Sequence, residues 1–177
     1  QRGKNDKADA HKLSLFAMRN HEDLSIHTLS SEAVRLLKTL LGLRKRLMKA
    51  KHILLVSYKE IKGFETQQVS EPIVTSSQKV IKDIELQLKQ TEKEIDQVLK
   101  ANEELKRNYD LLLSVPGIGR QSALHMIVFT KNFVSFICPK KFAAFSGIAP
   151  FQSSSGSSIR SRTKVSPKAN KKMKSLL

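Results

Sequence analysis

The sequence is poor in the residues that build disulfide frameworks, zinc sites and membrane spans. Its 177 residues include one cysteine, Cys138, which excludes an internal disulfide framework and fits a reducing compartment. The five histidines show no paired metal spacing, so no zinc site is predicted. No apolar run approaches the roughly 20 residues that a membrane helix needs. The polar N-terminus does not resemble a signal peptide.

Acidic residues are missing from residues 111–177, the last 67 positions of the chain. This segment supplies +11 of the formal net charge of +16. Such a basic surface indicates a polyanionic partner, either nucleic acid or an acidic membrane. A membrane-surface role is disfavoured, because the segment lacks a strong amphipathic helix with large apolar residues. The cationic residues are Arg120, Lys131, Lys140, Lys141, Arg160, Arg162, Lys164, Lys168, Lys171, Lys172 and Lys174.

The apolar periodicity predicts a mainly α fold. A first helix is expected over residues 6–20, capped by Asp6, and residues 21–30 are expected to form a connection. Two long helices are expected over about 31–62 and 76–113, with Ser30 or Ser31 as the cap of the first. Gly63 and residues 67–72 are expected to end that helix.

Both long helices carry apolar residues at alternating steps of three and four, as in a coiled coil. Asn102 falls on the second seam, where it is expected to fix the register. The helices could pair as an antiparallel hairpin or between chains, and the length of the second favours a dimer or larger complex. The seams are Leu36, Leu40, Leu43, Leu47, Ala50 and Leu54, and then Ile81, Ile84, Leu88, Thr91, Ile95, Val98, Asn102, Leu105, Tyr109 and Leu112.

After Ser114 the pattern changes to short helices and turns. Helices are expected over 122–129 and 140–145, the latter started by Pro139, with a Ser-, Arg- and Lys-rich segment over 152–170. A last helix is expected to open at residue 169, with Ser166 as its cap and Pro167 at its first position.

The turn over residues 115–119 matches the hairpin of helix-hairpin-helix DNA-binding units. Gly117 and Gly119 allow backbone N–H groups to approach a phosphate, and the next helix adds its N-terminal dipole. Arg120 is placed to help. The alternative is a plain helix–helix turn that binds no ligand.

Two further groups have both a functional and an ordinary interpretation. Serine-rich runs such as residues 153–158 are usually linkers, but a serine there could act in phosphoryl transfer with Arg160 and Arg162 nearby. Asp6 and Asp9 share one helical face, either as surface acids or as two ligands of Mg²⁺.

Together these segments resemble the insertion-sequence transposases that combine a DEDD, RuvC-like nuclease domain with a catalytic-serine C-terminal domain. That family includes bridge-RNA-guided recombinases and the pilin-gene invertase. Residues 4–10 look like the motif with the last two acids of the tetrad, and residues 113–119 look like the helix-hairpin-helix entry. The catalytic-serine block is matched by residues 145–150, then Ser155-Gly156, and then residues 165–170.

The resemblance implies a fold, a reaction and a set of partners. Residues 1–30 would be the tail of the RuvC-like α/β domain, 31–113 a coiled-coil hairpin, and 114–177 a small helical catalytic-serine domain. Ser155 would attack a DNA phosphodiester, and Asp6 and Asp9 would hold Mg²⁺. DNA, a guide (bridge) RNA and further copies of the chain, joined through the coiled coil, would be its partners in a bacterial or archaeal cytoplasm, near the nucleoid. Nucleic-acid contacts are expected from Gly117, Gly119, Arg120, Arg160, Arg162, Lys164, Lys168 and Lys171.

The sequence also departs from the family. Strands carrying the first Asp and the Glu are expected about a hundred residues earlier, and both ends of this sequence look cut. Ala169 stands where the family has Gly, and Met173-Lys174 where it has Leu-Arg. The chain is therefore expected to be an internal fragment that binds nucleic acid but does not cut it alone. The alternatives are a non-catalytic coiled-coil nucleic-acid-binding module and, last, a structural adaptor that leaves the basic tail unexplained.

Overall fold

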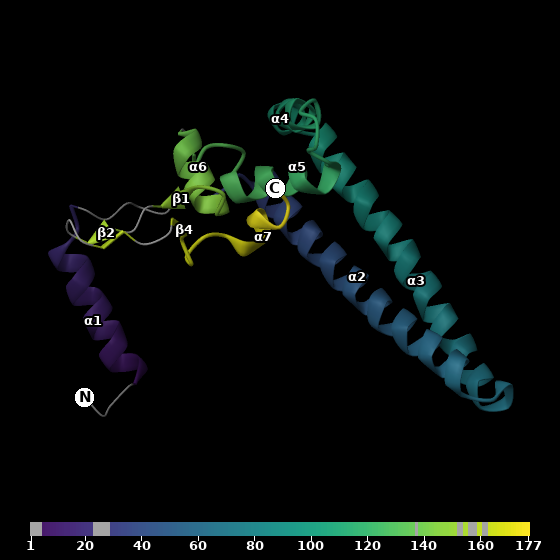
Figure 1. The fold of residues 1–177 in the computed structure, drawn as a ribbon. Helices are drawn as coiled ribbons and strands as arrows, with labels where there is room; N and C mark the ends of the chain where they lie inside the picture. The colour runs from purple at the N-terminus through teal and green to yellow at the C-terminus, as the bar shows by residue number, and fades with distance from the viewer. Residues whose placement is uncertain (1–4, 23–28, 137, 152–153, 156–158, 161–162) are drawn as a thin grey trace.

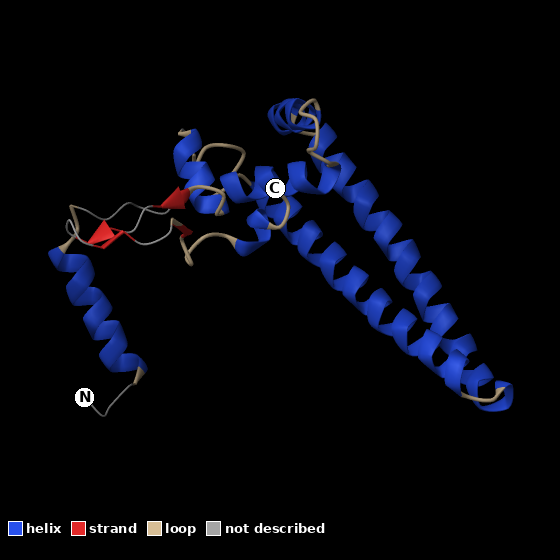
Figure 2. Cartoon of the chain, in the orientation of Figure 1, coloured by secondary structure: helices blue, strands red, loops and turns tan. Residues whose placement is uncertain are grey.

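The computed structural model describes residues 5–22, 29–136, 138–151, 154–155, 159–160 and 163–177. Most of these residues are helical, and two short antiparallel strand pairs project from the helical part, as Figure 2 shows. The predicted mainly α fold is thus confirmed. Within the described residues, no helix is long and apolar enough to cross a membrane.

The N-terminal helix, α1 (Asp6–Arg19), is confirmed, but its predicted cap is wrong. Asn5 is the cap, because its side-chain oxygen accepts a hydrogen bond from the N–H of Ala8 at 2.7 Å. Asp6 is instead the first helical residue, where its negative charge interacts favourably with the helix dipole. None of the residues of α1 is buried, so this helix adds nothing to the hydrophobic core.

Two long antiparallel helices, α2 (Glu32–Phe64) and α3 (Gln67–Lys100), form a hairpin within one chain, as Figure 1 shows. Ser31 caps α2, as predicted. Helix α2 ends at Phe64, next to Gly63 as predicted, but residues 67–72 already belong to α3, which runs through Pro72. Pro72 is exposed in the second turn of the helix and lacks only the one N–H that would bond the preceding turn.

The two predicted seams are buried to different degrees. Every member of the second seam is buried or half-buried. In the first seam, Leu36 and Leu43 are 47% and 37% exposed. Val34, Leu37 and Leu41 are buried instead. The apolar arc of α2 is wider than one partner helix can cover, so one edge of it stays at the surface.

The continuous helix predicted over residues 76–113 is broken at Asn102. After α3 ends, α4 (Glu103–Leu113) begins and takes a different direction (Figure 1). The Asn102 side chain accepts a hydrogen bond from the N–H of Leu105 at 2.9 Å, so Asn102 is the cap of α4. An N-cap asparagine satisfies an amide that has no partner inside the helix. The prediction that Asn102 fixes a coiled-coil register is therefore wrong.

The hydrophobic core lies at the base of the hairpin, where α2 begins and α3 ends. Helix α5 (Arg120–Thr130) crosses this base, and Ala123, Leu124 and Ile127 have no exposed surface. A helix that is apolar on several sides is expected where neighbours enclose it. The cluster continues through α4 and the last helix of the chain. Its buried members are Val34, Leu37, Leu40, Leu41, Ile95, Leu99, Leu105, Tyr109, Leu112, Ala123, Leu124, Met126, Ile127 and Met173.

Helix α6 (Pro139–Ser146) starts at proline as predicted. The segment after it, for which the sequence predicted only a Ser-, Arg- and Lys-rich composition, contains two nested antiparallel pairs. Strand β1 (Pro150–Phe151) pairs with β4 (Lys164–Val165), and β2 (Ser154–Ser155) pairs with β3 (Ile159–Arg160). Ile159 and Val165 are β-branched residues that favour strands. The serine-rich composition concealed this ribbon.

The last helix, α7 (Lys171–Lys174), is shorter than predicted and has a different cap. The Asn170 side chain accepts hydrogen bonds from the N–H groups of Lys172 and Met173, each at 3.1 Å. Ser166 accepts from the N–H of Lys168 and lies too early in the chain to cap α7. The N–H of Asn170 also donates to the carbonyl of Phe145 at 2.7 Å, which ties α7 to α6.

Replacing Gly147 by alanine is expected to destabilise the fold by about 1–3 kcal/mol, because both strain and overpacking oppose it. Gly147 has a φ of +75°, and an added Cβ would lie 2.8 Å from the Cβ of Ala169. Urea unfolding of the variant measures the loss.

Gly63→Ala is the matched control, since an added Cβ at Gly63 in α2 meets nothing within 4 Å. It should stabilise the protein by about 0.5–1 kcal/mol, the usual gain for alanine over glycine in a helix. Equal stability for the two variants would contradict the packing described for Gly147. Adding Ala169→Gly to Gly147→Ala should recover only the steric part of the loss.

Candidate nucleic-acid interface

The glycine turn between α4 and α5 lies at the surface. Gly117 has a φ of +91°, which favours glycine, whereas Gly119 has an ordinary φ of −83° and is the N-cap of α5. A Cβ built on either glycine would meet no heavy atom within 4 Å. No side chain caps the first turn of α5. The N–H groups of that turn are therefore open to an anion, as the sequence predicted, and a phosphate contact there stays a prediction.

Arg120, the first residue of α5, is already engaged. Its Nη1 lies 2.9 Å from Oδ1 of Asp96 on α3, in a half-exposed ion pair. A phosphate near the turn would have to share this guanidinium with the carboxylate. Sequence reasoning assigned Arg120 to a phosphate and could not see the competing acid, which lies 24 positions earlier (120 − 96).

The lysines that follow the ribbon are well placed for a polyanion. Lys164 in β4, Lys168 in the next turn and Lys171 in α7 are all exposed. None of the three forms an ion pair within the described part of the chain. The structure therefore brings these three predicted contact residues to the surface with their charges free.

The predicted nucleophile lies on the ribbon. Ser155 belongs to β2, opposite Ile159, and Arg160 belongs to β3, opposite Ser154. Arg162 lies outside the described residues, as do the side-chain positions of Ser155 and Arg160. Their predicted roles stay predictions.

The two candidate metal ligands, Asp6 and Asp9, are exposed in the first turn of α1. Asp9 lies 3.9 Å from Nζ of Lys12. Figure 1 shows that α1 begins at the end of the helix that lies away from β2, so the structure does not bring these acids to Ser155 within one chain. Across the described residues, no group of three His, Cys, Asp or Glu side chains could hold a metal ion. Two exposed carboxylates do not by themselves make a magnesium site.

Sequence reasoning missed a cluster of cations at the base of the hairpin. Arg44 on α2 binds Glu92 on α3, with 3.0 Å between Nε and Oε1. Lys45 follows Arg44 and is exposed, and Lys172 of α7 is half-buried. The pKa of Lys172 is lowered by burial and by the charge of Lys45. No sequence pattern joins residues so far apart.

His125 on α5 is buried beside these cations, with 8% of its surface exposed. Its Nδ1 lies 2.8 Å from the carbonyl oxygen of Gln121, so Nδ1 carries the proton in the neutral ring. Nε2 is buried and has no hydrogen-bond partner among the described residues. Burial lowers the pKa of His125, and the charges of Lys172, Arg44 and Lys45 lower it further.

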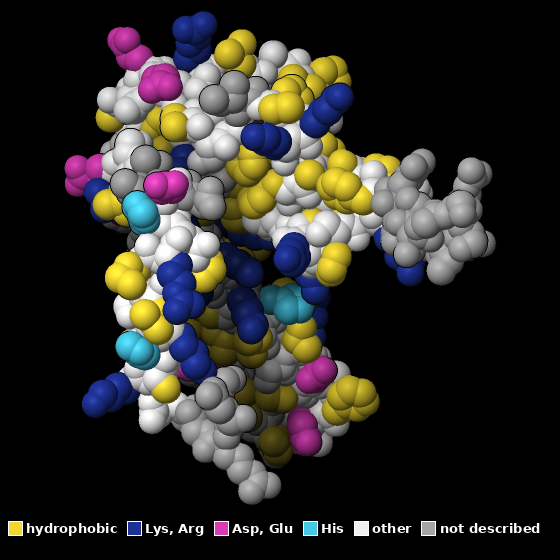
Figure 3. All heavy atoms as spheres, turned by 90° about the vertical axis from the view of Figure 1, so that its left-hand side faces the viewer, with side chains coloured by type: hydrophobic (Ala, Val, Ile, Leu, Met, Phe, Trp, Pro, Cys, Tyr) yellow, Lys and Arg dark blue, Asp and Glu magenta, His cyan; other side chains and the backbone are white. Residues whose placement is uncertain are grey.

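Cations also gather on one face of the molecule. In Figure 3, Lys and Arg side chains surround the hollow in the middle of this face, while the fewer Asp and Glu side chains lie nearer its edges. Such a concentration of one sign of charge attracts a polyanion and raises its association rate.

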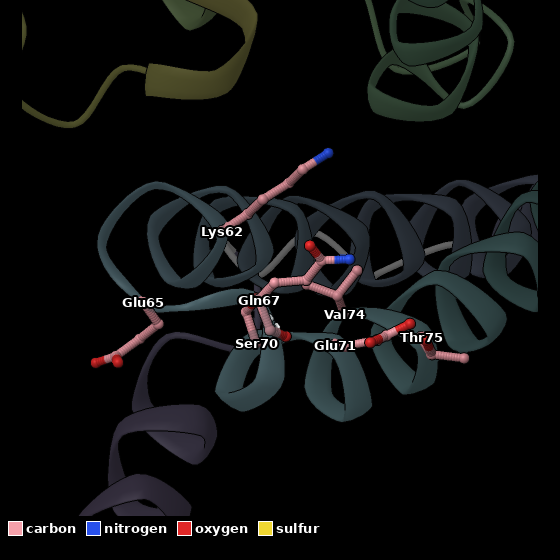
Figure 4. Close-up of a pocket in the computed structure, with 7 residues that line it drawn as sticks. All are labelled: Lys62, Glu65, Gln67, Ser70, Glu71, Val74 and Thr75. Atoms are coloured by element: carbon pink, nitrogen blue, oxygen red, sulfur yellow. Dashed lines mark hydrogen bonds between the residues drawn. The ribbon is translucent and has the colours of Figure 1, made fainter.

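One cavity lies elsewhere, at the tip of the hairpin, where α2 turns into α3 (Figure 4). This open groove has a volume of about 550 Å³ and contains none of the predicted site residues. Lys62 and Glu65 point away from each other at its rim, so they form no paired polar centre. The groove carries no evident chemistry. Its lining is Lys62, Glu65, Gln67, Ser70, Glu71, Val74 and Thr75.

The only cysteine, Cys138, is half-buried. It occupies the N-cap position of α6. Hydrogen bonds from the backbone N–H groups of Lys141 and Lys140 lower the pKa of its thiol. The position explains the shift without a catalytic role.

The acid-free C-terminal segment is also the part of the chain that matches a known protein family. Residues 109–177 match the family described as the transposase IS116/IS110/IS902 family. The pilin gene-inverting proteins of Moraxella bovis and Moraxella lacunata are each 31% identical to this chain over 88 residues. The matched segment is 50% of this chain, which spans 27% of the length of each relative. These similarities support a transposase or recombinase family for the C-terminal part.

Acidification is expected to destabilise the fold through His125. Its pKa is lowered in the folded state, so the unfolded chain takes up a proton first, near the ordinary value of 6.5. The contribution of the neutral His125 ring to the free energy of unfolding is therefore complete above about pH 6.5. It is lost as the pH falls from there toward the pKa of the folded state. Urea unfolding at pH 7.5 and pH 5.5 should show a smaller pH difference for His125→Gln than for the unaltered protein.

His52→Gln serves as the control, because His52 is exposed on α2. This variant should keep the pH difference of the unaltered protein. If His125→Gln keeps it too, burial of a neutral imidazole is not what makes the fold sensitive to acid.

Proposed function

We propose that this chain binds DNA as part of a DNA-rearranging protein of the transposase or recombinase class. The observation that carries the proposal is the coincidence of two features in one segment. Residues 111–177 contain no acid, and residues 109–177 are the part similar to a transposase family. The free, exposed charges of Lys164, Lys168 and Lys171 support the DNA contact.

In this proposal Ser155 is the nucleophile. Its Oγ loses a proton and attacks the phosphorus of a DNA phosphodiester, which forms a phosphoserine bond. The bond from phosphorus to the leaving nucleoside oxygen breaks, and that oxygen takes up a proton. Arg160 and Arg162 are proposed to stabilise the negative charge that develops on the phosphoryl oxygens. A second strand attacking the phosphoserine would reverse these steps and join DNA.

Asp6 and Asp9 are proposed as two of four acids that would hold Mg²⁺ in that protein. Since they lie away from β2, the serine and the acids would come from different copies of the chain. The exposed edge of α2, with Leu36 and Leu43, offers apolar surface for such an assembly. A guide RNA is the remaining expected partner, and the same basic surface would serve it.

The second candidate is a nucleic-acid-binding module without catalysis. It is favoured by one observation, that no group of three candidate metal ligands forms among the described residues. The two candidates share DNA binding and differ only in whether Ser155 forms a covalent bond.

The exposed lysines beyond the ribbon are expected to contribute directly to DNA binding. In the triple variant Lys164→Gln/Lys168→Gln/Lys171→Gln, the slope of log binding constant against log salt should become shallower by about 0.9 for each lost phosphate contact. Fluorescence anisotropy of a labelled DNA duplex measures the slope. The titration covers about 50 to 200 mM salt, where such binding is sensitive to salt.

Lys59→Gln/Lys79→Gln/Lys82→Gln is a control of identical net charge. These three lysines are exposed on the hairpin, outside the acid-free segment. The control should change the slope much less than the first triple variant. Equal effects would mean that net charge alone, and no defined surface, holds the DNA.

The substitution Ser155→Ala distinguishes the two candidate functions. DNA affinity of the 177-residue chain should be unchanged by this substitution under either of them. In a protein that also carries the remaining acids, incubation with DNA and Mg²⁺ should give a covalent protein–DNA adduct that Ser155→Ala abolishes. Denaturing gel electrophoresis with labelled DNA detects it. An adduct that persists in Ser155→Ala, or none from the unaltered protein, removes the nucleophile proposal.

A further inference from the structure

Charges at the base of the hairpin do not balance. Two acids of α3, Glu92 and Asp96, lie one turn apart and are each bound by an arginine, Arg44 and Arg120 respectively. Lys45 and Lys172 remain, and neither has an ion-pair or hydrogen-bond partner for its side chain in the described part of the chain. The cluster thus pairs two of its four cations and leaves two positive charges.

The fold itself holds these lysines together. Helix α7 is fixed to α5 by the buried side chain of Met173 and by a hydrogen bond of 3.1 Å from the Ser122 hydroxyl to the carbonyl of Leu176. Helix α5 in turn packs on α2, which carries Lys45. The core therefore fixes the helices that carry the two lysines relative to each other.

Lys172 is half-buried and Lys45 is exposed, and their like charges repel each other, which opposes folding. The neighbouring His125 cannot relieve this, because it is neutral and its Nε2 is buried. Such an arrangement is typical of a binding site for an anion, whose charge removes the repulsion. Lysine binds phosphate as a compact point charge with three donors.

We propose that Lys45 and Lys172 together bind a phosphate group of the nucleic-acid backbone at the base of the hairpin. This inference rests on the proposed function, since it assumes that the chain binds DNA. Lys172 follows Lys171 directly in α7, so the site continues the row of exposed lysines beyond the ribbon. The DNA would therefore extend from the ribbon to the hairpin, a part of the chain that the sequence assigned to assembly alone.

The test compares two double variants of equal net charge in the salt titration of duplex DNA. Lys45→Gln/Lys172→Gln should make the salt slope shallower by about 0.9 for each lost phosphate contact. Lys59→Gln/Lys82→Gln should leave it nearly unchanged, because both of those lysines are exposed on the hairpin, beyond the residues of α2 and α3 that form the core. Lys45→Arg/Lys172→Arg should retain most of the binding, since the charge is kept. Circular dichroism confirms that each variant is folded.

A second readout uses His125 as a reporter. Lys172 and Lys45 lower the pKa of His125, so a phosphate bound between them should raise it. NMR titration of the His125 ring with and without a DNA oligonucleotide measures this change. Removing both lysines should also raise the pKa of His125 in the free protein and abolish the further rise on DNA addition.

The outcomes separate this inference from the function it rests on. If the unaltered protein binds DNA steeply with salt but the Lys45/Lys172 variant behaves like the control, the site is wrong and the proposed function stands. If the unaltered protein does not bind DNA, both fail. If inorganic phosphate at low millimolar concentration shifts His125 and DNA does not, the site takes free phosphate and the assignment to nucleic acid is overturned.

Discussion

Enclosure of α5 at the base of the hairpin is the constraint on which the rest of the structure depends. Ala123, Leu124 and Ile127 are completely buried there, against residues of α2, α3, α4 and α7. At roughly 1.5–3 kcal/mol for each large apolar side chain removed from water, this contact outweighs any single ion pair on the surface. It fixes where the hairpin begins, where the glycine turn opens to solvent and where α7 can dock. Charged groups on all these elements acquire their positions from it.

Much of the helical architecture could be predicted from apolar spacing, because a period near 3.6 reports directly on which face is buried. The second seam and the proline start of α6 followed from local sequence. The failures have specific causes. Asn102 falls at an apolar position of the repeat but caps a helix, Pro72 is accommodated in the second turn of α3, and Ser154 and Ser155 pair with another strand. In each case an interaction that apolar spacing does not report decides the structure.

The candidate interface could be predicted in outline for a different reason. Net charge is additive along a sequence, so an acid-free segment identifies a basic surface whatever the fold. Which charges pair with each other cannot be obtained by such a sum, because it depends on the fold. The pairing of Arg120 with Asp96 and the convergence of Lys45 with Lys172, 127 positions apart (172 − 45), depend on how α3, α5 and α7 meet. Only tertiary structure could distinguish the engaged cations from the free ones.

The hairpin has a consequence for how proteins of this kind can diversify. Its 33- and 34-residue helices extend about 50 Å, but the continuous core ends within the first few turns from the base. Beyond that point each turn contacts only the turn opposite. Deleting or inserting seven residues in α2 together with seven in α3 would preserve the pairing and leave the base untouched. The length of the hairpin can therefore change in evolution without loss of the core at its base, much as a repeat array changes length by whole units.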